Sequence, residues 1–151
     1  MELNANHFVI PIDDRIQGFR NLTTLALSNN DFVGTLPSTL DKLTNLQHFE
    51  MGSNPNLGGS VVESIVHWPN LEHMDISETN VTGTIPSEFG RLSRLTSLGI
   101  WDVPLSGTIP SEVGNLVAIG KLKISVVLLS CCDYNERFFN SLIQYYLSIY
   151  F

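Results

Sequence analysis

The residues whose types and spacing could do chemistry are two histidines and two carboxylates. His48 and His73 lie 25 residues apart, and Glu50 and Asp75 are separated by the same number. Imidazole nitrogens and carboxylate oxygens are common zinc ligands, so four such side chains on neighbouring strands could hold a metal ion. The same spacing also fits solvated side chains that recur at one position of a repeat. We favour that simpler interpretation and predict no metal site.

Catalytic motifs do not accompany these residues. The sequence contains no G-x-G-x-x-G, H-R-D, D-F-G, G-x-S-x-G, H-E-x-x-H or C-x-x-C pattern. Cys131 and Cys132 are adjacent, and we expect free thiols because a disulfide between neighbours is strained. The sequence therefore predicts neither an enzyme nor a cofactor.

Charge and composition exclude further classes of protein. The chain has 151 residues, of which 43% are hydrophobic, and its net charge is −7. Proteins that bind nucleic acid normally present a basic face, so we expect no nucleic-acid partner. The hydrophobic content is too high for a disordered chain and suffices for one domain with a core.

A repeat of 24 to 25 residues positions these side chains. After a partial unit over 1–21, full units begin near Leu22, Leu46, Leu71, Leu95 and Ile119. Within a unit, alternation directs Leu25 and Leu27 inward and Thr24, Ala26 and Ser28 outward. One unit cannot bury its apolar face alone, whereas three or more stacked units can. The sequence predicts a solenoid over 1–125, with its short strands aligned in a parallel sheet.

The units resemble the leucine-rich repeat family, in the plant-type class of receptor-like kinases and receptor-like proteins. Its pattern, L-x-x-L-x-L-x-x-N-x-L-x-G-x-[IL]-P, matches LTTLALSNNDFVGTLP over 22–37 and LEHMDISETNVTGTIP over 71–86. The second unit departs from it, because 59–62 lacks the proline. The resemblance implies an α/β fold: a right-handed solenoid of about five repeats, with a curved parallel sheet on its concave side and short helices or 3-10 turns on its convex side.

Three kinds of structural residue follow from the pattern. Asparagines after the strands are expected to bond the turn backbone, glycines to adopt tight bends, and prolines to fix φ. These residues are Asn6, Asn30 and Asn54, then Gly34, Gly83 and Gly107, then Pro37, Pro86 and Pro110. Thr79 can replace the asparagine, whereas Val103 cannot, so we expect a looser turn toward the C-terminus.

The resemblance also implies that a ligand contacts the outward residues of the concave sheet. The candidate binding residues are His48, Glu50, His73, Asp75, Glu78, Trp101, Asp102, Lys121 and Lys123. Trp101 is the strongest single candidate, because a large aromatic on a polar strand face is typical of binding hot spots. The alternative is a tryptophan folded over its neighbours. The acidic middle of the face would attract a basic partner, although it could equally be a solvated surface.

The two ends depart from the repeat. The start has neither the basic residues nor the apolar segment of a signal peptide, and it lacks a cysteine-bearing cap, so a fragment of a longer array is expected. Seven of the fourteen aromatic residues lie in 126–151, whose apolar spacing favours an amphipathic helix. This divergent tail could cap the last repeat, lie on a membrane surface, or be foreign sequence. Two glycosylation motifs, at Asn21 and Asn80, are as many as chance predicts.

The sequence as a whole predicts a module that recognises a protein or peptide through its concave sheet, as a fragment of a leucine-rich repeat receptor-like protein. An intracellular scaffold without a signalling role is the alternative. Part of a receptor kinase whose catalytic domain lies outside this chain is less favoured. The resemblance suggests an extracellular or plasma-membrane ectodomain, and membrane contact is expected only through segments absent here or, weakly, through the tail.

Overall fold

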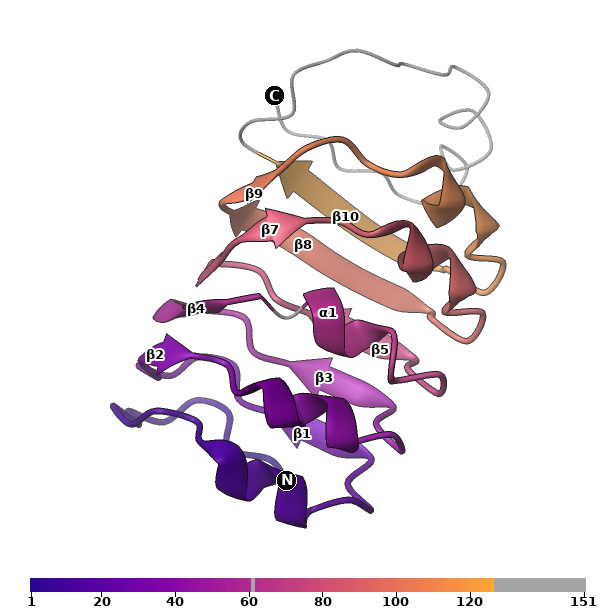
Figure 1. Ribbon diagram of the computed structural model, residues 1–151. Helices are drawn as coiled ribbons and strands as arrows, with labels where there is room; N and C mark the ends of the chain where they lie inside the picture. Colours follow the sequence, from indigo (N-terminus) through magenta and orange to yellow (C-terminus); the bar gives the residue numbers. More distant parts are fainter. Residues whose placement is uncertain (61, 127–151) are drawn as a thin grey trace.

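The computed structural model describes residues 1–60 and 62–126, which form a stack of repeats (Figure 1). One side of the stack is a five-stranded parallel sheet in the order β1-β3-β5-β8-β10. Its strands are β1 (Thr24–Ala26), β3 (His48–Glu50), β5 (His73–Asp75), β8 (Ser97–Val103) and β10 (Lys121–Val126). Because this order follows the sequence, each unit stacks on the one before it. The predicted leucine-rich repeat solenoid is confirmed.

The inward side chains of these strands make the core. Leu25, Phe49, Met74 and Leu98 occupy one row of the register and are at most 1% exposed. Fully burying such a side chain contributes about 1.5–3 kcal/mol, which a single unit could not obtain. Trp68 is also completely buried, and its indole N–H donates to the carbonyl of Leu40, 3.1 Å away.

Short helices cover the opposite side of the core (Figure 1). The 3-10 helices are η1 (Asp14–Gly18), η2 (Ser38–Lys42), η3 (Ser87–Arg91) and η4 (Ser111–Asn115). A proline with an extended backbone conformation precedes each of the last three 3-10 helices: Pro37, Pro86 and Pro110. The second unit, which lacks this proline, has the α-helix α1 (Val62–Ile65) instead. Before η1, Asp13 accepts hydrogen bonds from the side chain and backbone of Arg15, which lower the pKa of its carboxyl group.

Two small sheets that the sequence did not predict lie along a flank of the stack. They comprise β2 (Gly34–Thr35), β4 (Asn54–Gly59) and β6 (Thr79–Val81), and separately β7 (Gly83–Thr84) and β9 (Leu105–Ser106). The predicted glycine bends are found here. Gly34, Gly83 and Gly107 have φ values of 85°, 115° and 82°, and Gly59 continues the series with 93°.

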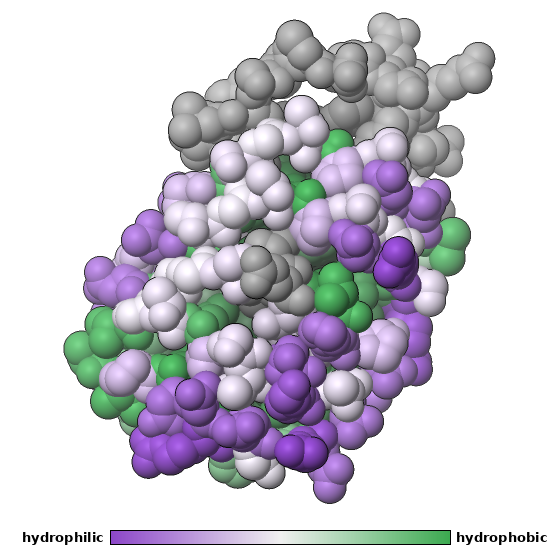
Figure 2. All heavy atoms as spheres, in the orientation of Figure 1, coloured by the Kyte–Doolittle hydropathy of each residue, from purple (hydrophilic) through white to green (hydrophobic). Residues whose placement is uncertain are grey.

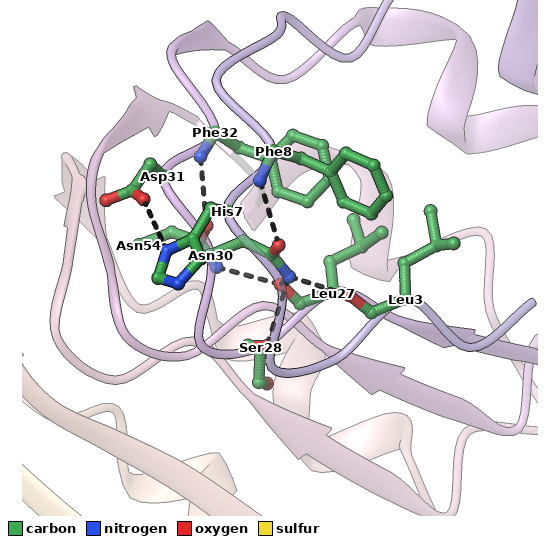
Figure 3. Close-up of polar contacts among 9 residues, drawn as sticks. All are labelled: Leu3, His7, Phe8, Leu27, Ser28, Asn30, Asp31, Phe32 and Asn54. Carbon is green, nitrogen blue, oxygen red and sulfur yellow. Dashed lines mark hydrogen bonds and ion pairs between the residues drawn. The ribbon is translucent and has the colours of Figure 1, made fainter.

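Buried asparagines bond adjacent units together, as Figure 3 shows for Asn30 and Asn54. The Asn54 amide donates to the carbonyls of Leu27, in the preceding unit, and Met51, at 3.0 and 2.8 Å. Its oxygen accepts from the Phe32 N–H at 3.2 Å. Asn30 repeats this pattern one unit earlier. Asn6 is exposed and bonds only nearby carbonyls, so the predicted role holds most fully at the two buried positions.

The asparagine series ends at the third unit. Thr79 donates its hydroxyl to the Ile76 carbonyl at 2.6 Å, a bond within its own unit. Val103 stands at the next equivalent position and is buried. The looser turn expected there is not found. Instead Asp102 has the same left-handed backbone as its equivalents in earlier units, and Val103, the last residue of β8, pairs with Val126 of β10 after a register shift between Ser125 and Val126.

Hydrophobic side chains lie exposed in the first unit. Phe8, Val9, Ile10 and Phe19 are 36–64% exposed, although the repeat frame places Phe8 and Phe19 at core positions. Phe8 stacks on the buried Phe32 with ring centroids 5.9 Å apart (Figure 3). Figure 2 shows hydrophobic atoms on the surface around this end of the stack. Among the described residues, no helix has the length and apolar character to cross a bilayer.

The predicted tail over 126–151 falls almost wholly outside the described residues. The capping helix and the state of Cys131 and Cys132 therefore remain predictions. Strand β10 ends at Val126, one residue beyond the predicted end of the solenoid at 125.

We expect Asn54→Ala to lower the free energy of unfolding by about 3 kcal/mol, because it leaves several buried backbone groups without partners. Urea denaturation followed by circular dichroism measures this change. Asn115→Ala, at an exposed position, is the control and should change stability by less than about 0.5 kcal/mol. Equal losses in the two variants would contradict the structural role of Asn54.

Two helix glycines make a second comparison. A methyl group at Gly90 in η3 would overlap the carbonyl oxygen of Glu112 in η4, whereas one at Gly18 in η1 would meet no atom within 4 Å. We expect Gly90→Ala to destabilise the protein by about 2 kcal/mol through overpacking of backbone, and Gly18→Ala to leave it unchanged. Thermal unfolding of both variants tests the close approach of η3 and η4, and a Gly90→Ala protein as stable as the parent would refute it.

Candidate functional site

Rows of outward side chains cross the concave sheet at right angles to its strands. The first row, set by the strand register, is Thr24, His48, His73, Ser97 and Lys121. The second row is Ala26, Glu50, Asp75, Gly99 and Lys123. The structure therefore brings six of the nine predicted binding residues into two adjacent rows.

The histidine pair and its neighbouring carboxylate form one contact group. The rings of His48 and His73 stack with centroids 6.0 Å apart. His73 Nε2 lies 3.1 Å from Glu50 Oε1. In the described part of the chain, no three histidine, cysteine or carboxylate side chains gather closely enough to hold a metal ion.

Asp75 lies over a part of the sheet that lacks large side chains. Its Oδ1 accepts from the Ser77 N–H at 2.9 Å. A methyl group at Gly99 would be 2.8 Å from the same oxygen, so the glycine makes room for the carboxylate. Gly52 and Ser77 are buried beside it. The floor of the face at this point consists of small residues, with the Asp75 carboxylate next to them.

Ala26 lies in an outward row, as its alternation predicts, but it is only 4% exposed. The backbone N–H of Ala26 donates to the Met1 carbonyl at 3.0 Å, and its carbonyl accepts from Leu3 N at 2.8 Å. The first residues of the chain therefore lie along β1 as an added edge, and Ala26 is covered between that edge and β3.

Trp101 stands beside this floor, on β8. The Lys123 ammonium is 3.6 Å from the centroid of its ring, a cation–π contact. The carbonyl of Trp101 accepts a hydrogen bond from Glu78 N at 2.9 Å. The small Ser77, which directly precedes Glu78, is therefore the neighbour of Trp101 on the side away from Lys123. The indole is partly exposed, and neither alternative from the sequence describes it fully: it contacts a neighbour and also projects from the face.

A further row follows the strands and was not recognised in the sequence. Ala5, Asn29, Ser53, Glu78 and Asp102 all have left-handed backbone conformations, with φ between 54° and 58°. The N–H groups of the middle three bond to the next unit: Asn29 to Gly52 O, Ser53 to Ser77 O and Glu78 to Trp101 O, each at 2.9 Å. Outside glycine and asparagine this conformation costs about 1–2 kcal/mol per residue. These residues could have been located in the sequence, because each directly precedes the position that holds an asparagine, threonine or valine in its unit.

A pocket of about 520 Å³ lies at the ends of these strands. It is lined by Ser53, Pro55, Glu78, Thr79, Asn80, Asp102, Val103, Pro104 and Leu105. Glu78 and Asp102, both predicted binding residues, enter it from adjacent units. The Ser53 hydroxyl donates to Glu78 Oε2. The sequence predicted these two acids as part of an acidic face but gave no sign of the pocket, because a hollow between the turns of successive units has no sequence motif of its own.

The charges on the face are unevenly distributed. Glu50, Asp75, Glu78 and Asp102 occupy the middle units, while Lys121 and Lys123 lie on the last strand. Of the two glycosylation motifs, both asparagines are exposed, but Asn80 also lines the pocket. The arrangement is suited to binding, since it offers an open polar surface, one aromatic ring and one recess.

Comparison with known proteins agrees with this architecture. The family model described as Leucine Rich Repeat matches residues 21–43 and 70–92. Receptor-like protein 39 of Arabidopsis thaliana is 34% identical over 85 residues, which are 55% of this chain and 10% of that protein. The chain thus spans about a tenth of the length of the curated relatives it matches.

Solved structures match over most of the chain. The ectodomain of the Arabidopsis receptor kinase HAESA, in complex with an extended IDA peptide hormone, is 33% identical with a TM-score of 0.78, covering 83% of this chain and 21% of that one. The ectodomain of the Arabidopsis receptor kinase GASSHO1/SCHENGEN3, in complex with CASPARIAN STRIP INTEGRITY FACTOR 2, is also 33% identical, with a TM-score of 0.79 over 85% of this chain and 15% of that one. These matches support a plant-type leucine-rich repeat family for the chain, whose repeats resemble those of receptor ectodomains in sequence and fold.

Proposed function

We propose that this chain is a recognition module that binds a peptide or an extended protein segment across its concave sheet, as part of a receptor-like protein. The observation that carries the proposal is the partly exposed indole of Trp101, which stands on the outward face of the sheet beside its polar rows and contacts Lys123. Two similar ectodomains were solved with peptide ligands or a named partner factor, and a curated relative is named a receptor-like protein. Both facts support the proposal.

The size of the face suits an extended ligand. Neighbouring strands lie about 4.8 Å apart, so the five strands span roughly 19 Å from first to last. An extended chain advances about 3.3 Å per residue, so about six ligand residues would cross all five strands. A ligand of this kind would meet each unit once, which allows one side-chain contact per unit.

The energetic centre of such a complex is Trp101. Its ring is already positioned by Lys123, so the ring loses little conformational freedom when a ligand covers its open side. Aromatic residues at the centre of an interface commonly account for 2 kcal/mol or more of binding energy. The carboxylates Glu50 and Asp75 nearby would favour a ligand with basic groups and increase its rate of association.

We expect Trp101→Ala to weaken ligand affinity by about thirtyfold, the equivalent of 2 kcal/mol. The ligands are peptides selected from a displayed random library on the immobilised chain, and fluorescence anisotropy measures their Kd. Because the indole is partly exposed, the melting temperature should fall by no more than a few degrees.

Val117→Ala is the matched control. Val117 is 86% exposed and lies outside the concave rows, so its truncation should not change affinity. Unchanged binding in Trp101→Ala would contradict a concave site centred on this residue. A large fall in its melting temperature would instead identify Trp101 as a packing residue.

A further inference from the structure

We propose that the pocket at the ends of the concave strands accepts a cationic side chain, an arginine or lysine, of the ligand. The inference rests on the proposed function, because it assigns the chemistry of one ligand residue to one part of the recognition surface. It concerns the 520 Å³ recess between the second and fourth units and not the sheet face itself. That volume falls within the range of about 300–1,000 Å³ usual for sites that enclose a ligand group.

The described residues that line the pocket give it a negative charge. Glu78 and Asp102 line it from consecutive units, and none of the described residues that form its walls is a lysine, arginine or histidine. Among the ion pairs of the described residues, none involves Glu78 or Asp102. Two carboxylates facing the same recess repel each other, and a bound cation would relieve that repulsion.

The rest of the lining suits the long aliphatic part of such a side chain. Pro55 and Pro104 are exposed at the mouth, while Val103 and Leu105 are buried behind it. Arginine and lysine carry three or four methylene groups that pack on apolar surface while the charged end stays with polar partners. A pocket with apolar walls and carboxylates therefore fits these residues better than it fits a small inorganic cation.

Glu78 is held in place before any ligand binds. The Glu78 N–H is bonded to the Trp101 carbonyl, and the Glu78 carboxylate accepts from the Ser53 hydroxyl. Asp102 directly follows Trp101 in the chain. A ligand that covers the indole would therefore have its neighbouring side chains next to the mouth of the pocket, which joins this recess to the proposed binding face.

The test uses the full chain labelled with nitrogen-15 and two probes, acetyl-Pro-Arg-Gly-amide and the same tripeptide with citrulline. Citrulline has nearly the shape of arginine but no charge. We expect saturable NMR shifts at the amides of Ser53, Glu78 and Asp102 with the arginine probe, and a Kd at least fivefold weaker with citrulline. Equal affinity for the two probes, or arginine-induced shifts that avoid these amides, would overturn the proposal.

Two variants and a control locate the effect. Asp102→Asn removes a charge and introduces a residue that tolerates the left-handed backbone, and Glu78→Gln keeps an oxygen that can accept from Ser53. Each should weaken binding of the arginine probe at least threefold with unchanged folding. Glu112→Gln removes an exposed acid on η4, outside the pocket, and should have no effect. An equal loss of affinity in Glu112→Gln would mean that the probe responds only to the overall charge of the protein, and it would refute the proposed binding in the pocket.

The failures of the two proposals can be told apart. If selected peptides depend on Trp101 but contain no preferred basic residue and bind Asp102→Asn normally, the pocket proposal fails and the concave site stands. If the arginine probe binds at the pocket while no library peptide depends on Trp101, the concave site fails and the cation pocket stands.

Discussion

The solenoid depends on the satisfaction of backbone groups between one unit and the next. Each unit is too short to form a core, and its turns expose carbonyls that no regular strand or helix of its own can pair. Asn54 resolves this at the second unit by binding Leu27 O in the unit before, Met51 O in its own unit, and the N–H of Phe32. Buried polar groups of this kind stabilise a structure only when all their bonds are made, so they also fix the spacing of the units. The same spacing separates neighbouring side chains within each row of the concave face.

Much of the architecture could be predicted from the sequence because its causes are local and periodic. The inward leucines, the asparagines at 30 and 54, the positive φ of Gly34, Gly83 and Gly107, and the prolines before the 3-10 helices all follow from residue types at fixed offsets. The adjacency of His48 with His73 and of Glu50 with Asp75 follows from the same period. Each of these features needs only one unit and its neighbour to be specified.

The features that escaped prediction depend on contacts that no single unit contains. Ala26 is covered because the first residues of the chain pair with β1, which its alternation pattern could not indicate. Val103 lacks a side chain that could bond the turn, yet the turn before it keeps its left-handed residue and Val103 pairs with Val126 of β10, a strand in the next unit. The pocket is formed by three successive turns whose left-handed residues differ in type, from Ser53 to Glu78 to Asp102. The sequence predicted two of its lining residues, Glu78 and Asp102, as binding residues, but it did not predict that a pocket would form between them.

The close approach of η3 and η4 at Gly90 has a consequence for the shape of the opposite face. The curvature of a stack depends on how much thicker its outer side is than its inner side. Helices that approach as closely as η3 and η4 keep the outer side thin at these two units, and a thin outer side reduces the rotation between successive units. A shallow arc keeps the strands of the inner sheet nearly level. Such a surface lets a straight segment of chain touch every unit in turn, whereas a steep horseshoe would hold only a rounded object.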